Sequence, residues 1–124
     1  MKALITTNSW WDTVDALAVH VVGTMVHRHR ELAAVMDRWI DADDFWLART
    51  AILHQLRWKS DTDTSRLFTY ALRRAADNEF FIRKAIGWAL RVYATTDPDA
   101  VRTFVDRHED TLSALTQREA RKHL

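Results

Sequence analysis

A repeat of 35 residues runs along the chain and constrains its fold more than any other feature. Three residues suited to cap a helix N-terminus stand at this spacing: Asn8, Asp43 and Asn78. Three aromatic residues share it: Trp11, Trp46 and Phe81. A fixed period of this length is typical of solenoids, in which each repeat is a helix pair that packs against its neighbours. We therefore expect an all-α protein, a right-handed α-solenoid with one helix of each pair lining the concave face.

Helix signals place the boundaries within this repeat. We expect repeats at about 8–42, 43–77 and 78–112, followed by a C-terminal capping helix at 113–124. N-caps, apolar spacing and the pair Asp97-Pro98 predict helices over about 9–30, 31–40, 45–59, 64–76, 80–94 and 98–108. Thr116 and Glu119 have the spacing of a capping box, which predicts a short last helix beginning at that point.

The first predicted helix has its apolar stripe at Trp10, Val14, Leu17 and Val21, spaced four, three and four residues apart. No segment comparable to an N-terminal capping repeat precedes Asn8. The end repeats of a solenoid need a polar outer face. We therefore expect the N-terminal edge of the stack to expose an apolar face unless another chain covers it.

Composition narrows the class of protein. The 124 residues fit one domain and include only 2 Gly and 1 Pro, so helix breakers are rare. The absence of cysteine excludes disulfides and thiolate metal sites. No apolar run approaches the roughly 20 residues of a membrane span, and the N-terminus is too short for a signal peptide, so we expect a cytoplasmic protein. With a net charge of +1, any surface that binds nucleic acid must be local.

Three residues in the first two repeats suggest chemistry. Trp11 and Asp15 are four residues apart, so a helix places them on one face. A flat π surface beside a fixed negative charge suits an electron-poor, positively charged ring. Arg49 stands inside an apolar arc and must be paired or face a cleft. Two interpretations of Arg49 stay open: a structural salt bridge to an acid on the first helix, or a clamp for phosphate.

The helix predicted at 80–94 has two stripes. Its buried stripe is Ile82, Ile86, Ala89 and Tyr93. A second stripe, on the opposite side, is Lys84, Trp88 and Arg91. Trp88 could pack against the next repeat beside two solvated charges. Because the helix already has a complete core face, we favour a functional role for this tryptophan and its two cations.

Metal and nucleophile chemistry find no support in the sequence. His27 and His29 are two residues apart, so on a helix they do not face each other. The remaining histidines show no ligand spacing, and we find neither a nucleophile motif nor a glycine-rich phosphate loop. We expect no metal ion and no organic cofactor.

Four stretches carry a resemblance to a known family. They are Ser9-Trp10-Trp11-Asp12-Thr13-Val14-Asp15, Trp46-Leu47-Ala48-Arg49 with Ala51-Ile52-Leu53, Glu79-Phe80-Phe81-Ile82-Arg83-Lys84-Ala85-Ile86-Gly87-Trp88-Ala89-Leu90-Arg91, and Leu115-Thr116-Gln117-Arg118-Glu119-Ala120 with Lys122-His123-Leu124. With these residues the chain resembles the DNA alkylation repair family, the HEAT-like-repeat DNA glycosylases. The resemblance covers essentially the whole chain. Family members are typically twice this long, and the chain resembles their C-terminal half.

The resemblance implies an activity and roles for individual residues. Family members excise cationic N3- and N7-alkylated purines from DNA. Asp15 matches their catalytic carboxylate, and Trp11 and Trp88 match the aromatic pair of the catalytic cleft. The residues implied to bind DNA are Arg49, Arg91, Lys84 and Arg57. The implied partner is double-stranded DNA that contains alkylated purines.

An alternative function remains open at this stage. The missing half helps family members to bind the duplex, so the chain could be a non-catalytic HEAT-like module that binds DNA or a protein. It could also be a fragment, or a short relative that forms a homo-oligomer or pairs with another chain at its N-terminal edge.

Overall fold

The structure is a computed structural model that describes residues 15–122 and residue 124, and this part of the chain is helical, without strands. Its first half holds the π-helix η2 (Leu17–Val22), α2 (Gly23–Arg28), the 3-10 helix η3 (Arg30–Leu32), α3 (Ala33–Trp39) and α4 (Phe45–Leu53). Its second half holds the 3-10 helix η4 (Lys59–Asp61), α5 (Thr64–Arg73), α6 (Phe80–Ala94), α7 (Pro98–Arg107) and α8 (Ala114–Ala120). The prediction of an all-α fold is confirmed.

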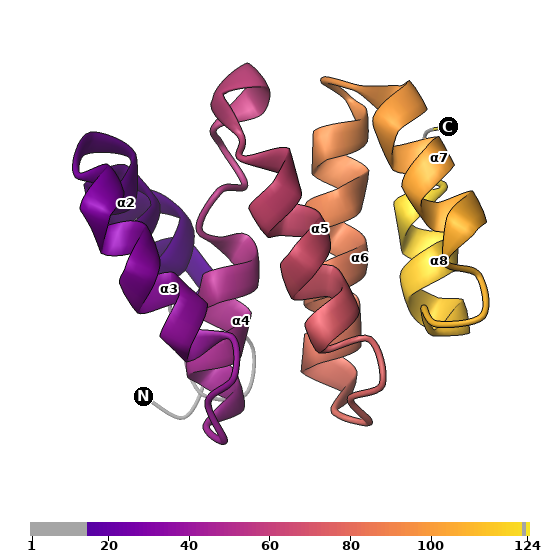
Figure 1. Ribbon diagram of the computed structural model, residues 1–124, viewed down its shortest axis with the longest axis horizontal. Helices are drawn as coiled ribbons and strands as arrows, with labels where there is room; N and C mark the ends of the chain where they lie inside the picture. Colours follow the sequence, from indigo (N-terminus) through magenta and orange to yellow (C-terminus); the bar gives the residue numbers. More distant parts are fainter. Residues whose placement is uncertain (1–14, 123) are drawn as a thin grey trace, which may run out of the picture.

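The helices form two layers (Figure 1). Helices α3, α5 and α7 make up the front layer of this view, and α4, α6 and α8 lie behind them. η2 packs against α4, α4 against α6 and α6 against α8, so the rear layer is continuous. Each rear helix therefore contacts its counterpart in the next repeat, as a solenoid requires. The repeat boundaries themselves stay a prediction.

Acidic side chains begin four of the helices. Each accepts a hydrogen bond from a backbone N–H in the first turn that has no partner within the helix. These N-caps are Asp44 of α4, Asp63 of α5, Glu79 of α6 and Asp97 of α7. Asp44 and Glu79 keep the interval of 35 residues but stand one position later than the caps predicted at Asp43 and Asn78. The third predicted cap, Asn8, lies outside the described residues.

Several helix boundaries differ from the prediction, and α5 ends at Arg73 instead of about residue 76. α4 ends at Leu53 instead of continuing to residue 59, and Lys59 has a φ of 52°, which a right-handed helix excludes. The N-cap of α8 is Ser113, whose hydroxyl accepts a hydrogen bond from the backbone N–H of Thr116 at 3.1 Å. The capping box predicted for Thr116 and Glu119 is therefore wrong, because Thr116 already lies within the first turn.

Leu17 and Val21, the second half of the predicted apolar stripe of the first helix, are not a buried face, and its first half, Trp10 and Val14, lies outside the described residues. Leu17 and Val21 are 52% and 48% exposed, whereas Ala18 and Val26 are buried. The reason is the π-helix, whose i→i+5 bonds place more residues in each turn than the 3.6 of an α-helix. A stripe read at the α-helical period therefore rotates away from the core. The exposed pair agrees with the apolar N-terminal edge that the sequence predicts.

One hydrophobic core connects the two layers. Its largest fully buried apolar side chains are Met36, Ile40, Leu53, Ile82, Ile86 and Leu90. The predicted buried stripe of α6 belongs to it, although Tyr93 is only half-buried. Gly23 lets the first helix approach the end of α4, since a Cβ there would lie 2.4 Å from the carbonyl oxygen of His54.

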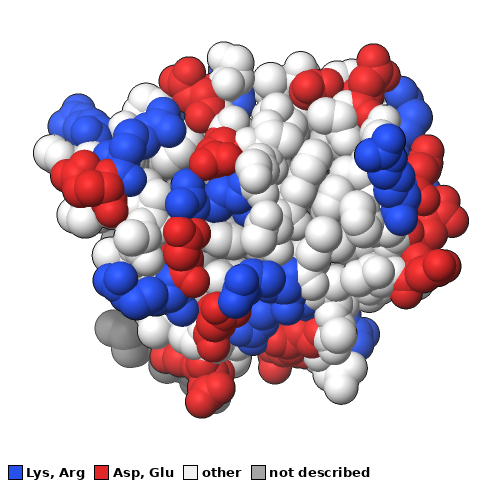
Figure 2. Space-filling view, in the orientation of Figure 1, with Lys and Arg blue, Asp and Glu red and all other residues white. Residues whose placement is uncertain are grey.

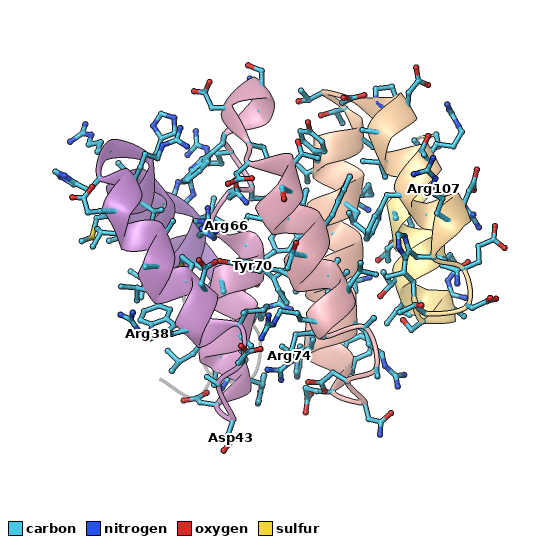
Figure 3. All side chains as sticks on the ribbon, viewed as in Figure 1. Arg38, Asp43, Arg66, Tyr70, Arg74 and Arg107 are labelled. Atoms are coloured by element: carbon cyan, nitrogen blue, oxygen red, sulfur yellow. The ribbon has the colours of Figure 1, made fainter. Side chains whose placement is uncertain are left out.

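Ion pairs join the helices of the front layer. Arg66 donates from Nε and Nη2 to the two carboxylate oxygens of Asp37, at 2.8 and 2.9 Å. The Tyr70 hydroxyl donates to the same carboxylate at 2.5 Å, and Figure 3 shows Arg66 and Tyr70 between α3 and α5. The hydrogen bond from Arg66, helped by that from Tyr70, lowers the pKa of Asp37 to about 2. α3 and α5 are thus held together by a charged network at the surface.

Candidate active site

Asp15 and Arg49 form a buried ion pair where the beginning of the described chain packs against α4. Asp15 lies in the helical turn just before η2, and Arg49 lies in α4. Arg49 donates from Nε to Asp15 Oδ1 and from Nη2 to Asp15 Oδ2, both at 2.8 Å. The side chains of Arg49 and Asp15 are only 6% and 12% exposed. A bidentate pair of this kind fixes the plane of the carboxylate as well as its position.

Arg49 also reaches α6, the next helix of the rear layer after α4. Its Nη1 donates a short hydrogen bond to the backbone carbonyl of Phe81 in α6. The guanidinium of Arg49 in α4 therefore connects Asp15, in the helical turn before η2, with α6. Of the two interpretations left open by the sequence, the structure shows the salt bridge to an acid on the first helix. A contact between Arg49 and DNA phosphate stays a prediction.

Aromatic rings cluster around Phe81, whose backbone carbonyl accepts the hydrogen bond from Arg49. Phe45 and Trp46 open α4, with ring centroids 4.4 Å apart, and Phe81 lies 6.1 Å from Phe45 and 5.8 Å from Trp46. Trp46 and Phe81 are two of the three aromatic residues at the interval of 35. The first of them, Trp11, lies outside the described residues, so its predicted place beside Asp15 is untested.

The second stripe of α6 is not a free surface. Trp88 is half-buried and packs against the hydrophobic core, so its expected position away from the core is only partly met. Lys84 forms an ion pair with Glu119 of α8, and Nη1 of Arg91 lies 3.9 Å from Oε2 of the same carboxylate. The structure thus brings Lys84 and Arg91 together through Glu119, for which the sequence predicts a place in a capping box.

Glu119 is held in its charged form by its surroundings. The residue is buried, and Nζ of Lys122 lies 2.7 Å from Oε2. Hydrogen bonds from Lys122 and Lys84 lower the pKa of Glu119 to about 2, against the opposing effect of burial. The signal that could have found this residue is its distance of 35 residues from Lys84, which is the repeat period.

Arg57 stands apart from these clusters. It is exposed, and its Nη1 lies 2.6 Å from Nδ1 of His20. Because a guanidinium can only donate, Nδ1 of His20 is the acceptor in this contact. Arg57 remains accessible at the surface, and its predicted contact with DNA is untested.

The described part of the chain shows two further features that bear on function. It holds no group of three or more histidine, cysteine or acidic side chains arranged to bind a metal ion. None of the helices described here is both long enough and apolar enough to span a membrane.

Comparisons with known proteins identify what the chain is similar to. The family model described as "DNA alkylation repair enzyme" matches residues 1–124. A solved structure, a predicted DNA alkylation repair enzyme from Enterococcus faecalis, superposes with a TM-score of 0.83 at 36% sequence identity. The match covers 99% of this chain and 57% of that one, so the chain spans little more than half the length of its relative. A search of curated proteins found no match.

Proposed function

Because the chain belongs to the DNA alkylation repair enzyme family, we propose that it binds DNA and excises cationic purines alkylated at N3 or N7. The proposed reaction is hydrolysis of the N-glycosidic bond. The observation that carries this proposal is the buried Asp15–Arg49 pair, which fixes the carboxylate that matches the family's catalytic position. Trp88 on α6 would supply one aromatic wall of the cleft, and Trp11 the other.

The chemistry needs little more than a well-placed carboxylate. Alkylation at N3 or N7 gives the purine a positive charge, so the base leaves with the electron pair of the C1′–N bond as a neutral molecule. Positive charge develops on the deoxyribose, and a water molecule adds to C1′ and loses a proton. In the proposed mechanism Asp15 stabilises the developing charge and orients the water. The products are the free alkylpurine and an abasic site.

The contacts of Asp15 are compatible with this role. Each carboxylate oxygen accepts one hydrogen bond from Arg49, which leaves further lone pairs on both oxygens. A carboxylate held at both oxygens needs no reorientation during the reaction, and such preorganisation is the main source of electrostatic catalysis. In this proposal Arg49 positions Asp15 in addition to any contact with the DNA backbone.

Aromatic and basic residues would hold the lesion and the strand. A cationic base over an indole gains on the order of 0.5–2 kcal/mol from cation–π attraction. Lys84, Arg91 and Arg57 would contact phosphates, which makes binding weaken as salt is added. The partner in this proposal is double-stranded DNA carrying alkylated purines, and the proposed location is the cytoplasm.

Release of 7-methylguanine from methylated duplex DNA by the purified 124-residue chain tests the proposal. We expect release by the wild-type chain and a loss of at least about 100-fold in Asp15→Asn, with DNA binding retained. Equal release by both proteins would remove Asp15 from the mechanism. Absence of release by a folded wild-type chain that binds DNA would support the second candidate function.

That second candidate is a non-catalytic HEAT-like module that binds DNA or a protein through the same surface. Two observations favour it. The chain spans only 57% of its solved relative, and Arg49 balances the negative charge that catalysis would use. The same release experiment separates the two functions, because a binding module retains methylated DNA without cleaving the glycosidic bond.

The N-terminal edge suggests a partner chain. Leu17, Val21 and Met25 stand four residues apart and are each about half exposed, so they form an apolar strip along η2 and α2. A second copy or another helical chain covering this strip is part of the proposal. Sedimentation of the 124-residue chain checks it: a dimer that dissociates in Val21→Glu supports the covered edge, and a stable monomer contradicts it.

A further inference from the structure

Glu119 gathers three cations around one buried carboxylate. Lys84 of α6 pairs with Oε1, while Nζ of Lys122 lies 2.7 Å and Nη1 of Arg91 lies 3.9 Å from Oε2. The Glu119 side chain is only 6% exposed, whereas those of Lys84, Arg91 and Lys122 are 42%, 32% and 48% exposed. The carboxylate thus lies beneath cations that remain open to solvent. The cluster carries two positive charges in excess.

The position of Glu119 depends on a close contact between two helices. A Cβ at Gly87 of α6 would lie 2.6 Å from Cβ of Glu119 and 3.3 Å from the carbonyl oxygen of Thr116. No larger residue fits at Gly87 unless α8 moves. One turn earlier, the Thr116 hydroxyl donates to the carbonyl of Arg83 at 3.0 Å, which fixes α8 against α6. Glu119 is therefore held rigidly below the cations.

The cluster shares its register with the candidate active site. Asp15, Arg49, Lys84 and Glu119 follow one another at intervals of 34, 35 and 35 residues. They therefore occupy equivalent positions in successive helices of the rear layer. Arg49 also bonds to the carbonyl of Phe81, which is one helical turn before Lys84. The excess positive charge thus lies on the same row of equivalent positions that begins at Asp15.

We propose that Glu119 is a positioning residue that assembles Lys84, Arg91 and Lys122 into a single site for one phosphate of the DNA backbone. This inference rests on the proposed function, which supplies the DNA. A phosphodiester carries one negative charge, and the cluster can take it up without leaving a buried charge unpaired. Because all three cations lie around the same carboxylate, they serve one phosphate jointly and not three phosphates separately.

The salt dependence of binding tests whether the cations share one phosphate. Each phosphate neutralised contributes about −0.9 to the slope of log affinity against log salt. We expect Lys84→Gln and Lys122→Gln each to make the slope shallower, and the double variant to change it by about 0.9 in total. Independent contacts would change it by about 1.8 in the double variant, which would overturn the shared site. Fluorescence anisotropy with labelled duplex DNA measures these slopes.

Glu119→Gln gives a test in which the positioning role and the net charge predict opposite changes in DNA affinity. The substitution removes a negative charge, so attraction through net charge alone would tighten DNA binding. If Glu119 positions the cations, binding weakens several-fold and the slope becomes shallower. Glu119→Gln should add nothing further in the Lys84→Gln background, because both changes dismantle the same site. Tighter binding by Glu119→Gln would overturn the inference.

Two controls separate this inference from its premises. Arg102→Gln removes an equally exposed cation from α7 in the front layer and should leave the slope unchanged. Circular dichroism checks that each variant keeps the helix content of the wild-type chain, and Gln117→Ala provides a change in α8 that leaves the net charge unaltered. If the wild-type chain binds no DNA, the proposed function and this inference both fail. If it binds and the cluster variants keep the wild-type slope, only this inference fails.

Discussion

Two arginine–aspartate pairs of nearly the same geometry stand on opposite layers of the molecule. In the rear layer Arg49 holds both oxygens of Asp15 at 2.8 Å, and in the front layer Arg66 holds both oxygens of Asp37 at 2.8 and 2.9 Å. Their surroundings differ. The rear side chains are 6% and 12% exposed, and the front side chains are 26% and 46% exposed.

The front pair belongs to a mixed, solvated surface. Figure 2 shows basic and acidic residues alternating over α3 and α5, with an uncharged area between α5 and α7. A further solvated ion pair, Arg73–Asp41, shares this region. Water competes for such charges and weakens their attraction. The rear pair instead sits where desolvation is costly, so its retention calls for a reason other than stability. The comparison teaches that two ion pairs of nearly the same geometry can differ in burial, so geometry alone cannot identify the candidate functional pair.

Removing the arginine from each pair should give the largest difference in stability. Arg49→Met leaves the carboxylate of Asp15 buried without its partner, which costs about 3–5 kcal/mol. Arg66→Met should cost about 1 kcal/mol or less, since solvent reaches Asp37 and Tyr70 still donates to it. Urea denaturation at neutral pH measures both free energies of unfolding. Equal losses would show that burial does not separate the two pairs.

A double replacement sharpens this result. Asp15→Leu with Arg49→Met removes both charges, so most of the lost stability should return. The same protein should be inactive in base release if the pair is kept for function. Full recovery of stability together with wild-type release would contradict the account of Asp15.

Protonation of His54 should destabilise the rear layer by an intermediate amount. Nδ1 donates to the carbonyl of Ala51 at 2.6 Å, so in the neutral ring Nε2 carries no proton. Nε2 has no hydrogen-bond partner within the described structure. Burial lowers the pKa of His54 to about 4, from 6.5 in the unfolded chain. The stability is therefore fully present above pH 6.5 and decreases as the pH falls from 6.5 to 4. The expected loss is about 3 kcal/mol.

Denaturation at pH 7, 5.5 and 4.5 measures this dependence. His54→Phe keeps a ring of similar size beside Trp58 and cannot be protonated. In that variant the decrease between pH 6.5 and 4 should be greatly reduced. The described acidic groups with lowered pKa values, Asp37, Asp77 and Glu119, lose their contribution mainly below this range, as the pH falls from about 4.5 towards 2. A decrease of the same size in His54→Phe would assign the pH dependence to other groups.

The smallest effect is expected at Arg73. Its pair with Asp41 has the same bidentate contacts, at 2.9 and 2.7 Å, but both side chains are about half exposed. Arg73→Gln should leave the denaturation midpoint unchanged within error. A midpoint lowered as much as in Arg49→Met would show that the front pairs also hold the fold together.

The sequence could predict the fold and part of the site because both follow the repeat. The interval of 35 residues indicates which positions meet in neighbouring helices, and Arg49 in an apolar arc requires a partner one repeat away. Asp15 lies 34 residues earlier and is that partner. The same interval could have connected Lys84 to Glu119. The spacing between Thr116 and Glu119, however, also fits a capping box. The sequence thus offers two interpretations of Glu119, a capping box within α8 and a contact with Lys84 of α6. The structure shows the contact with Lys84.

Other features could not be read from one sequence. The π-helix η2 changes the number of residues per turn, and the sequence carries no strong signal for it. The α-helical period therefore predicts Leu17 and Val21 on the buried face, whereas both are about half exposed. Gly87 lets α8 approach α6 so closely that a Cβ there would lie 2.6 Å from Cβ of Glu119. Close approach at a glycine is a property of two helices together, so the spacing within α6 could not reveal it.

The central claim is that Asp15, the buried one of the two aspartates held by arginine, is the residue required for base excision. Single-turnover release of 7-methylguanine from duplex DNA, compared between Asp15→Asn and Asp37→Asn, tests it most directly. Both variants replace an arginine-bound aspartate by its amide, so they are matched in chemistry. The account predicts a loss of at least about 100-fold in Asp15→Asn and a wild-type rate in Asp37→Asn. Equal rates in the two variants would contradict it.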